Sequence, residues 1–261
     1  MTVGELLDAA TTLLRTRVRL LLGVGFLVAL LEQVVLFPLR QAADVTYLVF
    51  PHEDRWGWYA LLLLVGFGTE MAGIAVLGAF TSGAGPRALL GAAAPARPVP
   101  VGRAALLALT IGLFATVAGA TVVAGPVVFL LLGLVMPALV IDRLGPGRAL
   151  LRSMSLSVRR VLRAGWIRLL GYLSWLFIRL ATGIAGWAAL GLFLDTGTAE
   201  RDHLATGAAW LLVNTLAYPT LACLDTVLHL DLRMRTEGLD LGLRRALSRR
   251  VSCDAALAVP R

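Results

Sequence analysis

The chain has 261 residues, of which 58% are hydrophobic and only 15% are charged, and its mean hydropathy is +0.82. A soluble globular domain is about 45–50% apolar and about 25% charged. The composition therefore indicates a polytopic membrane protein and excludes a soluble enzyme, a disordered tail and a disulfide scaffold. The two cysteines, Cys223 and Cys253, fall in an expected span and in the tail, so no disulfide framework is expected.

The formal net charge is +8, and all 24 basic residues are arginine. These arginines lie beside hydrophobic segments rather than among aromatic residues, which favours an anionic membrane surface over nucleic acid as their partner. The absence of lysine from the sequence, together with the heavy use of alanine and leucine, indicates a GC-rich bacterial source.

Six segments come close to the roughly 20 apolar residues that a helix needs to cross a hydrocarbon core about 30 Å thick. They are residues 18–38, 56–80, 104–122, 125–141, 166–194 and 204–224. Residues 104–141 carry no charge, and Gly125-Pro126 predicts a tight turn within them. We expect an all-α fold, a polytopic membrane bundle of six transmembrane helices plus amphipathic interfacial helices. It forms a single domain, 1–250, and a short cytoplasmic tail follows at 251–261.

The arginines also predict the orientation. If the N-terminus is cytoplasmic, 20 of the 24 arginines fall on the cytoplasmic side. The outer loops hold Arg40, Arg55 and Arg201, while Arg179 lies inside a span. Such a bias is the usual positive-inside pattern. Glu5 and Asp8 stand where a signal peptide would be basic, so the first span is expected to be an uncleaved anchor. We expect a bacterial cytoplasmic (inner) membrane protein with both termini in the cytoplasm.

Three cytoplasmic segments are expected to form amphipathic helices, at 2–16, after the Gly145-Pro146-Gly147 turn, and around 239–250. Thr2 and Glu5 predict a capping box at the start of the first. The second has an arginine-rich face that we expect to contact anionic lipid headgroups. Its arginines are Arg148, Arg152, Arg159, Arg160 and Arg163. Residues 81–103 hold four prolines and are expected to be a loop with a short helix at 87–94.

Three segments resemble a known family. The first is Gly4-Glu5-Leu6-Leu7-Asp8 followed by Leu14-Arg15, and the second is Pro137-Ala138-Leu139-Val140 followed by Asp142 and Arg152-Ser153. The third is the most specific and comprises Asp231, Arg233, Arg235, Glu237, Gly238 and Asp240. Together they resemble bacterial multipass proteins that carry the membrane domain named after glycerophosphodiester phosphodiesterase.

The sequence departs from that family pattern at two positions. Asp142 stands where Glu is common, and His229 stands where Tyr is common. No part of the chain is left over for the hydrolase domain of that name. The resemblance therefore implies a fold and a membrane location, but neither phosphodiesterase activity nor catalytic residues.

Arg19 and Arg168 lie at the inner edges of their expected spans, and three charges lie deeper inside the spans: Glu32, Glu70 and Arg179. A charged group at a helix centre costs about 2.5–3.5 kcal/mol on insertion scales, so such groups are usually paired. At about 1.5 Å per residue, Glu70 and Arg179 lie at similar depths, so we expect an intramembrane ion pair. The pair would either fix helix packing or form an anion, headgroup or proton site. Glu32 lies nearer the outer face and predicts a polar vestibule with Gln33.

Other chemistry finds little support. His52 and Glu53 are adjacent in a loop and His203 is isolated, and no HExxH or CxxC spacing occurs, so neither a metal nor a cofactor is expected. No catalytic constellation can be assembled from the serines and histidines. Asn214 and Pro219 interrupt the sixth span, either as a packing kink or as a transport hinge.

The first expectation for function is a non-enzymatic accessory or scaffold that docks a membrane-protein partner, or a second copy of the chain, on its arginine-rich cytoplasmic side. The alternative is a small permease or lipid-handling transporter that uses Glu70, Arg179 and Glu32, and a membrane enzyme is third. An open cavity that reaches Arg179 would favour transport. A closed bundle with a large apolar patch on one flank would favour a partner.

Overall fold

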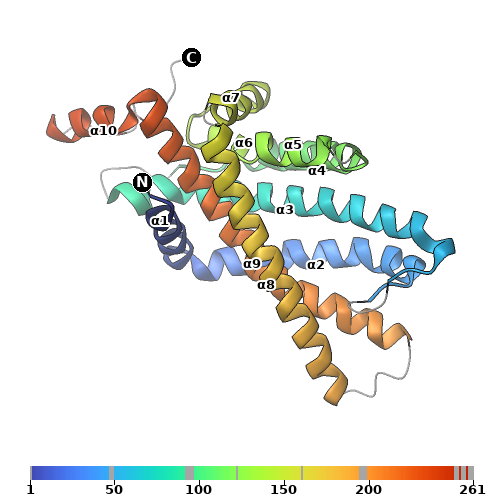
Figure 1. Cartoon of the computed structure of the whole chain (residues 1–261). Helices are drawn as coiled ribbons and strands as arrows, with labels where there is room; N and C mark the ends of the chain where they lie inside the picture. The colour runs from blue at the N-terminus through green and yellow to red at the C-terminus, as the bar shows by residue number, and fades with distance from the viewer. Residues whose placement is uncertain are drawn as a thin grey trace.

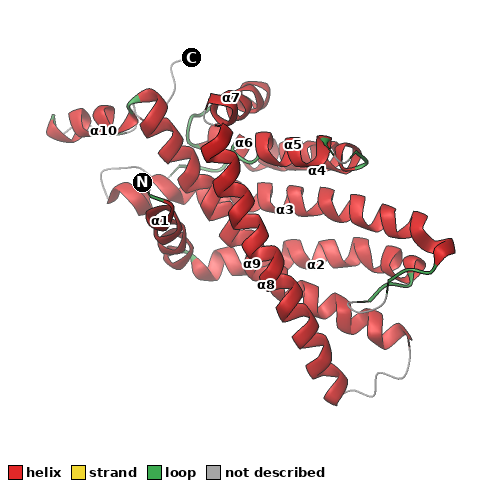
Figure 2. Ribbon diagram, viewed as in Figure 1, coloured by secondary structure: helices red, strands yellow, loops and turns green. Residues whose placement is uncertain are grey.

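The computed structural model of the chain describes residues 2–46, 50–91, 97–121, 123–159, 161–193 and 199–249, together with Cys253 and Leu257. Within these residues the regular secondary structure is entirely helical (Figure 2). The elements are α1 Val3–Thr16, α2 Val18–Ala43, the 3₁₀ turn η1 Glu53–Arg55, α3 Trp56–Leu90, α4 Val101–Gly119, α5 Ala124–Leu132, α6 Val135–Val140, α7 Pro146–Arg159, α8 Val161–Phe193, α9 Ala199–Glu237 and α10 Leu239–Ser248. The all-α helical bundle expected from the sequence is confirmed.

Among the described residues, five helices are long and apolar enough to cross a membrane. These segments are Val18–Ala43, Glu53–Ala88, Val101–Gly119, Arg163–Ala189 and Glu200–Glu237. In Figure 1, α2 and α3 lie side by side, α4 covers α3, and α8 lies along α9 and crosses the others obliquely. The helices α1 and α10 lie at the same end of the bundle. The five helices indicate a multi-pass membrane protein.

The segment expected to be the fourth span, 125–141, is not one helix of crossing length. It is divided into α5 and α6, and it forms only a shorter apolar unit, Ala124–Val140. Arg168 of α8 donates a hydrogen bond to the carbonyl of Phe129, four residues before Gly133, and a Cβ atom at Gly133 would collide with the Arg168 guanidinium. The arginine therefore bonds to the carbonyl that would accept a hydrogen bond from the Gly133 amide if the helix were continuous.

The helix α3 extends ten residues beyond its expected end, to Leu90, and includes Pro86. The expectation of a loop over 81–86 is therefore wrong. The short helix expected at 87–94 is, as far as Leu90, the end of α3 and not a separate helix, and residues 92–94 lie outside the described residues. Thr81 Oγ1 lies 2.7 Å from Thr226 Oγ1 and donates to the Ala222 carbonyl at 3.2 Å. These buried bonds hold the end of α3 against α9, and this tertiary packing outweighs the local signal of the proline.

The capping box expected at the N-terminus is confirmed. The Thr2 amide donates to Glu5 Oε2 at 2.7 Å, and the Glu5 amide donates to Thr2 Oγ1 at 3.2 Å. The apolar face of α1, with Leu6 and Leu13, is buried against α9 and α3. The helix is therefore packed on the bundle along one face while its other face is exposed.

Pro219 lies inside the continuous helix α9. Because proline has no N–H, the carbonyl of Thr215, four residues earlier, loses its helical donor. A Cβ atom at Gly25 of α2 would lie 2.8 Å from that carbonyl oxygen and 2.9 Å from the Pro219 side chain. The proline thus marks a point of close approach between α2 and α9, which supports the packing interpretation.

Candidate functional site

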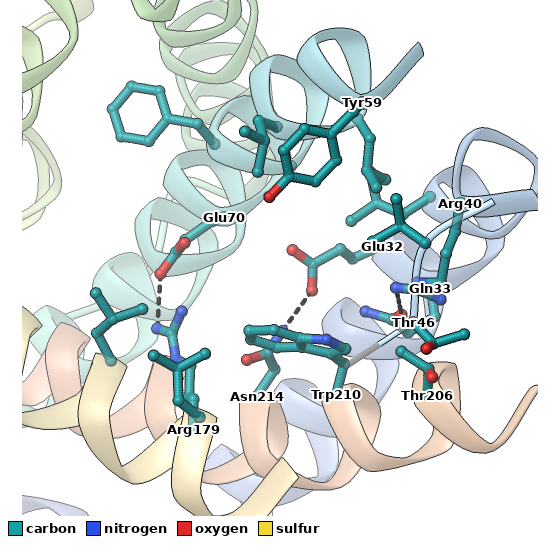
Figure 3. Close-up of a pocket in the computed structure, with 18 of the residues that line it drawn as sticks. Glu32, Gln33, Arg40, Thr46, Tyr59, Glu70, Arg179, Thr206, Trp210 and Asn214 are labelled. Atoms are coloured by element: carbon teal, nitrogen blue, oxygen red, sulfur yellow. Dashed lines mark hydrogen bonds and ion pairs between the residues drawn. The ribbon is translucent and has the colours of Figure 1, made fainter. Parts of the chain in front are cut away.

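A cavity of about 390 Å³ lies between α2, α3, α8 and α9 (Figure 3). The polar and aromatic residues labelled in Figure 3 line it: Glu32, Gln33, Arg40, Thr46, Tyr59, Glu70, Arg179, Thr206, Trp210 and Asn214. Small-molecule sites commonly enclose about 300–1,000 Å³ and combine apolar walls with a few polar groups. The size and lining of this cavity match that description.

The structure brings together Glu70 of α3 and Arg179 of α8. Arg179 Nη2 lies 2.6 Å from Glu70 Oε1, and both residues are buried. The Tyr172 hydroxyl donates to Glu70 Oε2 at 3.3 Å. The Arg179 guanidinium also lies 5.7 Å from the ring centre of Tyr172 and 5.3 Å from that of Tyr218, which are cation–π distances. The pair forms part of the cavity wall.

Glu32 of α2 is only 5% exposed, although its carboxylate points into the cavity (Figure 3). The Tyr218 hydroxyl donates to Oε1 at 2.6 Å, and the Asn214 amide donates to Oε2 at 2.8 Å. A third, longer bond comes from the Thr69 hydroxyl at 3.4 Å. All three partners are uncharged, so Glu32 is held by neutral donors from α9 and α3.

Gln33, expected to share a vestibule with Glu32, also lines the cavity but has a different partner. Arg40 Nη2, about two helical turns further along α2, donates to Gln33 Oε1 at 2.8 Å. Arg40 was assigned to an outer loop by the sequence, yet it lies in α2 and is only 5% exposed. The vestibule therefore contains a cation that sequence analysis did not place there.

The cavity is bordered by apolar residues on α3 and α8. Leu63 and Leu180 line it, and they are 55% and 40% exposed, respectively. The helix α3 packs chiefly on α2, α4 and α9, whereas α8 packs chiefly on α9. The rim between α3 and α8 thus faces the surroundings. Leu63 lies seven residues into α3, about 10 Å along the helix from its start.

A second polar cluster lies at the opposite end of the bundle, where the family-like C-terminal motif meets the α6–α7 connection. Asp142 Oδ1 is 2.8 Å from Arg233 Nη1 and 3.0 Å from His229 Nε2, and Asp142 Oδ2 is 3.2 Å from Arg152 Nε. Arg233 Nε also contacts Glu237 at 3.0 Å, and Arg152 contacts the same carboxylate. We call Asp142, Arg152, His229, Arg233 and Glu237 the inner cluster.

Electrostatics within the inner cluster favour an ionised Asp142. Burial acts to raise the pKa of this carboxyl, but His229, Arg233 and Arg152 outweigh it and hold the pKa below its ordinary value of 3.8. The charges at this end are therefore mutually compensated.

The remaining residues of the family-like C-terminal motif are Asp231, Arg235, Gly238 and Asp240, and they lie within or between α9 and α10. Asp231 accepts from Arg163 at 3.3 Å and from Arg235, four residues later, at 3.1 Å. Gly238 has a φ of +64°, the left-handed conformation that separates α9 from α10. Asp240 lies in the first turn of α10.

The arginines assigned to lipid headgroups divide into two groups. Arg152 and Arg163 are engaged in the ion pairs described above, because the α7–α8 segment turns these side chains toward α9. Arg148 and Arg159 are exposed on α7, next to the exposed Leu151 and Val158. Arg160 lies outside the described residues. Among the described members, Arg148 and Arg159 are therefore the two that are exposed, and their contact with headgroups stays a prediction.

Sequence analysis missed four residues that complete the buried polar groups: Tyr172, Tyr218, Arg168 and Asp225. Arg168 Nε lies 2.7 Å from Asp225 Oδ1, and both are buried. Asp225 stands immediately after the expected end of the sixth span, so a boundary error of one residue hid an intramembrane charge. No comparable signal marks the two tyrosines, since tyrosine is common in apolar helices.

His203 Nε2 lies 3.4 Å from Asp44, whereas His52 and Glu53 are exposed. Among the described residues, no group of three or more histidine, cysteine or acidic side chains has the geometry of a metal site.

The chain matches no family model, no curated protein and no solved structure. The fold and the site define a class, a multi-pass helical membrane protein with a polar cavity among its spans.

Proposed function

We propose that this protein is a small permease or lipid-handling transporter that takes an amphipathic ligand into the cavity between α2, α3, α8 and α9. The polar headgroup lies among Glu32, Glu70 and Arg179, and the apolar part extends through the α3–α8 rim toward the bilayer. The single observation that carries the proposal is an open cavity that reaches Arg179 from the apolar rim of Leu63 and Leu180.

The cavity also favours transport over the scaffold hypothesis. Burying charges costs several kcal/mol per ion, and a protein that only docks a partner gains nothing from doing so inside its spans. The exposed apolar faces of α2, α4 and α8 do not favour a partner, because lipid chains cover such faces in any membrane bundle.

Bound lipid tests this proposal directly. Lipid that remains with protein purified in mild detergent is quantified by mass spectrometry for the wild type and for Gly66→Leu. Gly66 lines the cavity, and its added Cβ atom would meet Leu36 at an ordinary 3.7 Å, so leucine fills the cavity without a backbone clash. We expect Gly66→Leu to retain several-fold less lipid.

The matched control is Gly23→Leu, because Gly23 of α2 is exposed with open space around its Cβ position. It should retain as much lipid as the wild type. In proteoliposomes, the wild type and Gly23→Leu should move a fluorescent lipid between leaflets, and Gly66→Leu should not. Equal binding and equal movement in all three proteins would contradict the proposal.

We also propose that the protein lies in a bacterial cytoplasmic membrane with both ends in the cytoplasm, which the arginine distribution supports. Arg148→Cys and Glu53→Cys are treated with a membrane-impermeant maleimide in intact cells. Only Glu53→Cys should react before the cells are broken, because it lies on the outer side in this orientation. Reaction of Arg148→Cys in intact cells would show that the protein has the opposite orientation.

Membership of the glycerophosphodiester phosphodiesterase membrane-domain family is likewise a proposal, supported by the motif residues of the inner cluster and their neighbour Asp231. It carries no catalytic role, and our proposed function uses none.

A further inference from the structure

We propose that the cavity recognises a positively charged primary amine, with Glu32 as the group that receives it. This inference rests on the proposed function and identifies the ligand class by its headgroup. The amine belongs to an aminophospholipid such as phosphatidylethanolamine or to a free organic amine, and the experiment distinguishes these two sources.

The hydrogen bonds described at Glu32 are all donated to its two carboxylate oxygens, as an ionised carboxylate requires. Asn214 Nδ2 donates both to Glu32 Oε2 at 2.8 Å and to the Tyr218 hydroxyl oxygen at 2.9 Å. Since that oxygen already accepts a bond, Tyr218 is free to donate its own proton to Glu32 Oε1 at 2.6 Å. Both carboxylate oxygens therefore accept bonds, Oε1 from Tyr218 and Thr69 and Oε2 from Asn214, and Oε2 retains capacity for one more.

This carboxylate has no cation of its own among the described residues. Every charged neighbour is committed elsewhere: Arg179 to Glu70, and Arg40 to Gln33, while the partners of Glu32 are all neutral. A lone buried carboxylate is unfavourable within a bilayer, and buried charges are normally paired. A cationic group on the ligand would complete the pair.

The neighbouring groups suit an amine that donates N–H bonds. Asn214 Oδ1 is buried and has no hydrogen-bond partner in the described part of the protein. It belongs to the same side chain that holds Glu32, so one ammonium group can donate to both residues. A primary ammonium carries three donors, which matches a charge and at least one further acceptor.

Two aromatic residues border the same space. Figure 3 shows Tyr59 and Trp210 on opposite sides of the region into which the Glu32 carboxylate points, and both line the cavity. Aromatic rings stabilise a nearby ammonium through the cation–π interaction. The cavity thus combines a carboxylate, an acceptor amide and aromatic rings, a set suited to a cationic nitrogen.

The test compares ligands on the delipidated wild-type protein in dodecyl maltoside micelles. The probes are phosphatidylethanolamine, phosphatidylpropanol with identical acyl chains but a methyl group in place of the amine, and free ethanolamine. Binding is measured by native mass spectrometry and by competition. We expect phosphatidylethanolamine to bind about tenfold more tightly than phosphatidylpropanol, the effect of one charge-assisted hydrogen bond.

The lipid and the free amine are then told apart by competition. If the ligand is a lipid, millimolar ethanolamine leaves the bound phosphatidylethanolamine in place. If the ligand is a soluble amine, ethanolamine binds on its own and displaces the lipid. Either result supports a cationic amine at the site.

Two variants test whether Glu32 causes the preference for phosphatidylethanolamine over phosphatidylpropanol. Glu32→Gln preserves the side-chain volume and removes the charge, so the tenfold preference should fall to about twofold or less. Glu53→Gln is the matched control, because Glu53 is exposed outside the cavity, and it should keep the full preference. Equal affinity of the two lipids for the wild type overturns the inference, whether or not Glu32→Gln folds.

The two proposals fail in different ways. If both lipids bind equally and Gly66→Leu still abolishes binding, the cavity holds lipid but does not recognise an amine. If neither lipid binds, or Gly66→Leu binds like the wild type, the proposed function itself is wrong.

Discussion

The two ends of the bundle differ in how their buried charged groups are paired. At the inner cluster, Asp142 is surrounded by His229, Arg233 and Arg152, and Arg233 is shared with Glu237. In the cavity, Arg179 pairs with Glu70 while Glu32 receives only neutral donors. The first end is a network of mutually compensated charges. The second is open and holds a carboxylate without a counter-ion.

This difference separates a structural role from a functional one. A compensated network fixes the α6–α7 connection against α9, and any loss of a member leaves its partners uncompensated. An uncompensated group gives the folded protein no such benefit and is instead available to a ligand. The comparison can be tested because the two ends should respond differently to the loss of one charge.

The largest effect is expected at the inner cluster. Asp142→Asn removes the acceptor shared by two arginines and a histidine, so the free energy of unfolding should fall by about 3–5 kcal/mol. Unfolding in mixed micelles of sodium dodecyl sulfate and dodecyl maltoside measures it. Asp54→Asn, in the exposed turn η1, is the matched control and should change it by less than about 0.5 kcal/mol. Equal stability of the two variants would contradict a structural role for the inner cluster.

The ionisation of the Asp142 carboxyl also predicts how the stability of the folded protein depends on pH. Because the folded-state pKa of Asp142 is lowered, its contribution to stability is complete above the ordinary value of 3.8 and is lost as the pH falls toward the folded value. The wild type should therefore lose stability on acidification below about pH 4, and Asp142→Asn should show a smaller loss. If the stability of the wild type and of Asp142→Asn fell in parallel with pH, Asp142 would not be the cause of the acid-induced loss.

The intramembrane pair should give the next largest effect. Arg179→Ala leaves Glu70 buried without a cation, so the free energy of unfolding should fall by about 2–3 kcal/mol. This loss is smaller than that expected for Asp142→Asn because the cavity admits water. Adding Glu70→Gln removes the stranded charge and should recover part of the loss. Folded yield by size-exclusion chromatography measures both. A double variant no better than Arg179→Ala would show that the two residues do not act as a pair.

Glu32→Gln should have a small effect on stability, in contrast to Asp142→Asn. Removing a carboxylate that lacks a counter-ion relieves its desolvation cost, which offsets the weakened bonds from Tyr218 and Asn214. We expect the free energy of unfolding of the ligand-free protein to change by less than about 1 kcal/mol. A loss as large as that of Asp142→Asn would assign Glu32 a structural role.

The sequence predicted the membrane helices well and the polar sites unevenly. Hydrophobic length identifies spans because every buried backbone group must be satisfied within its own helix. The matching depths of Glu70 and Arg179 follow from the helical rise alone, and the two residues do lie in contact. Depth within a helix is thus a local property that sequence reveals.

The rest depends on packing between distant helices. The division between α5 and α6 arises from Arg168, 35 residues after Gly133, and the continuation of α3 through Pro86 arises from Thr226 on α9. Likewise, Tyr218 and Asn214 reach Glu32 from a helix more than 180 residues away. No local pattern encodes which helix faces a given side chain, so these contacts could not be predicted.

The smallest effect is expected from the bond that holds α3 to α9. Thr81→Val keeps the shape of the side chain but removes the hydroxyl that contacts Thr226 and the Ala222 carbonyl. Hydrogen bonds between membrane helices average about 0.6 kcal/mol, so the loss of unfolding free energy should be near that value. Thr110→Val is the matched control, because the exposed Thr110 hydroxyl bonds only within α4. If Thr81→Val is as stable as this control, the extension of α3 to Leu90 depends on apolar packing alone.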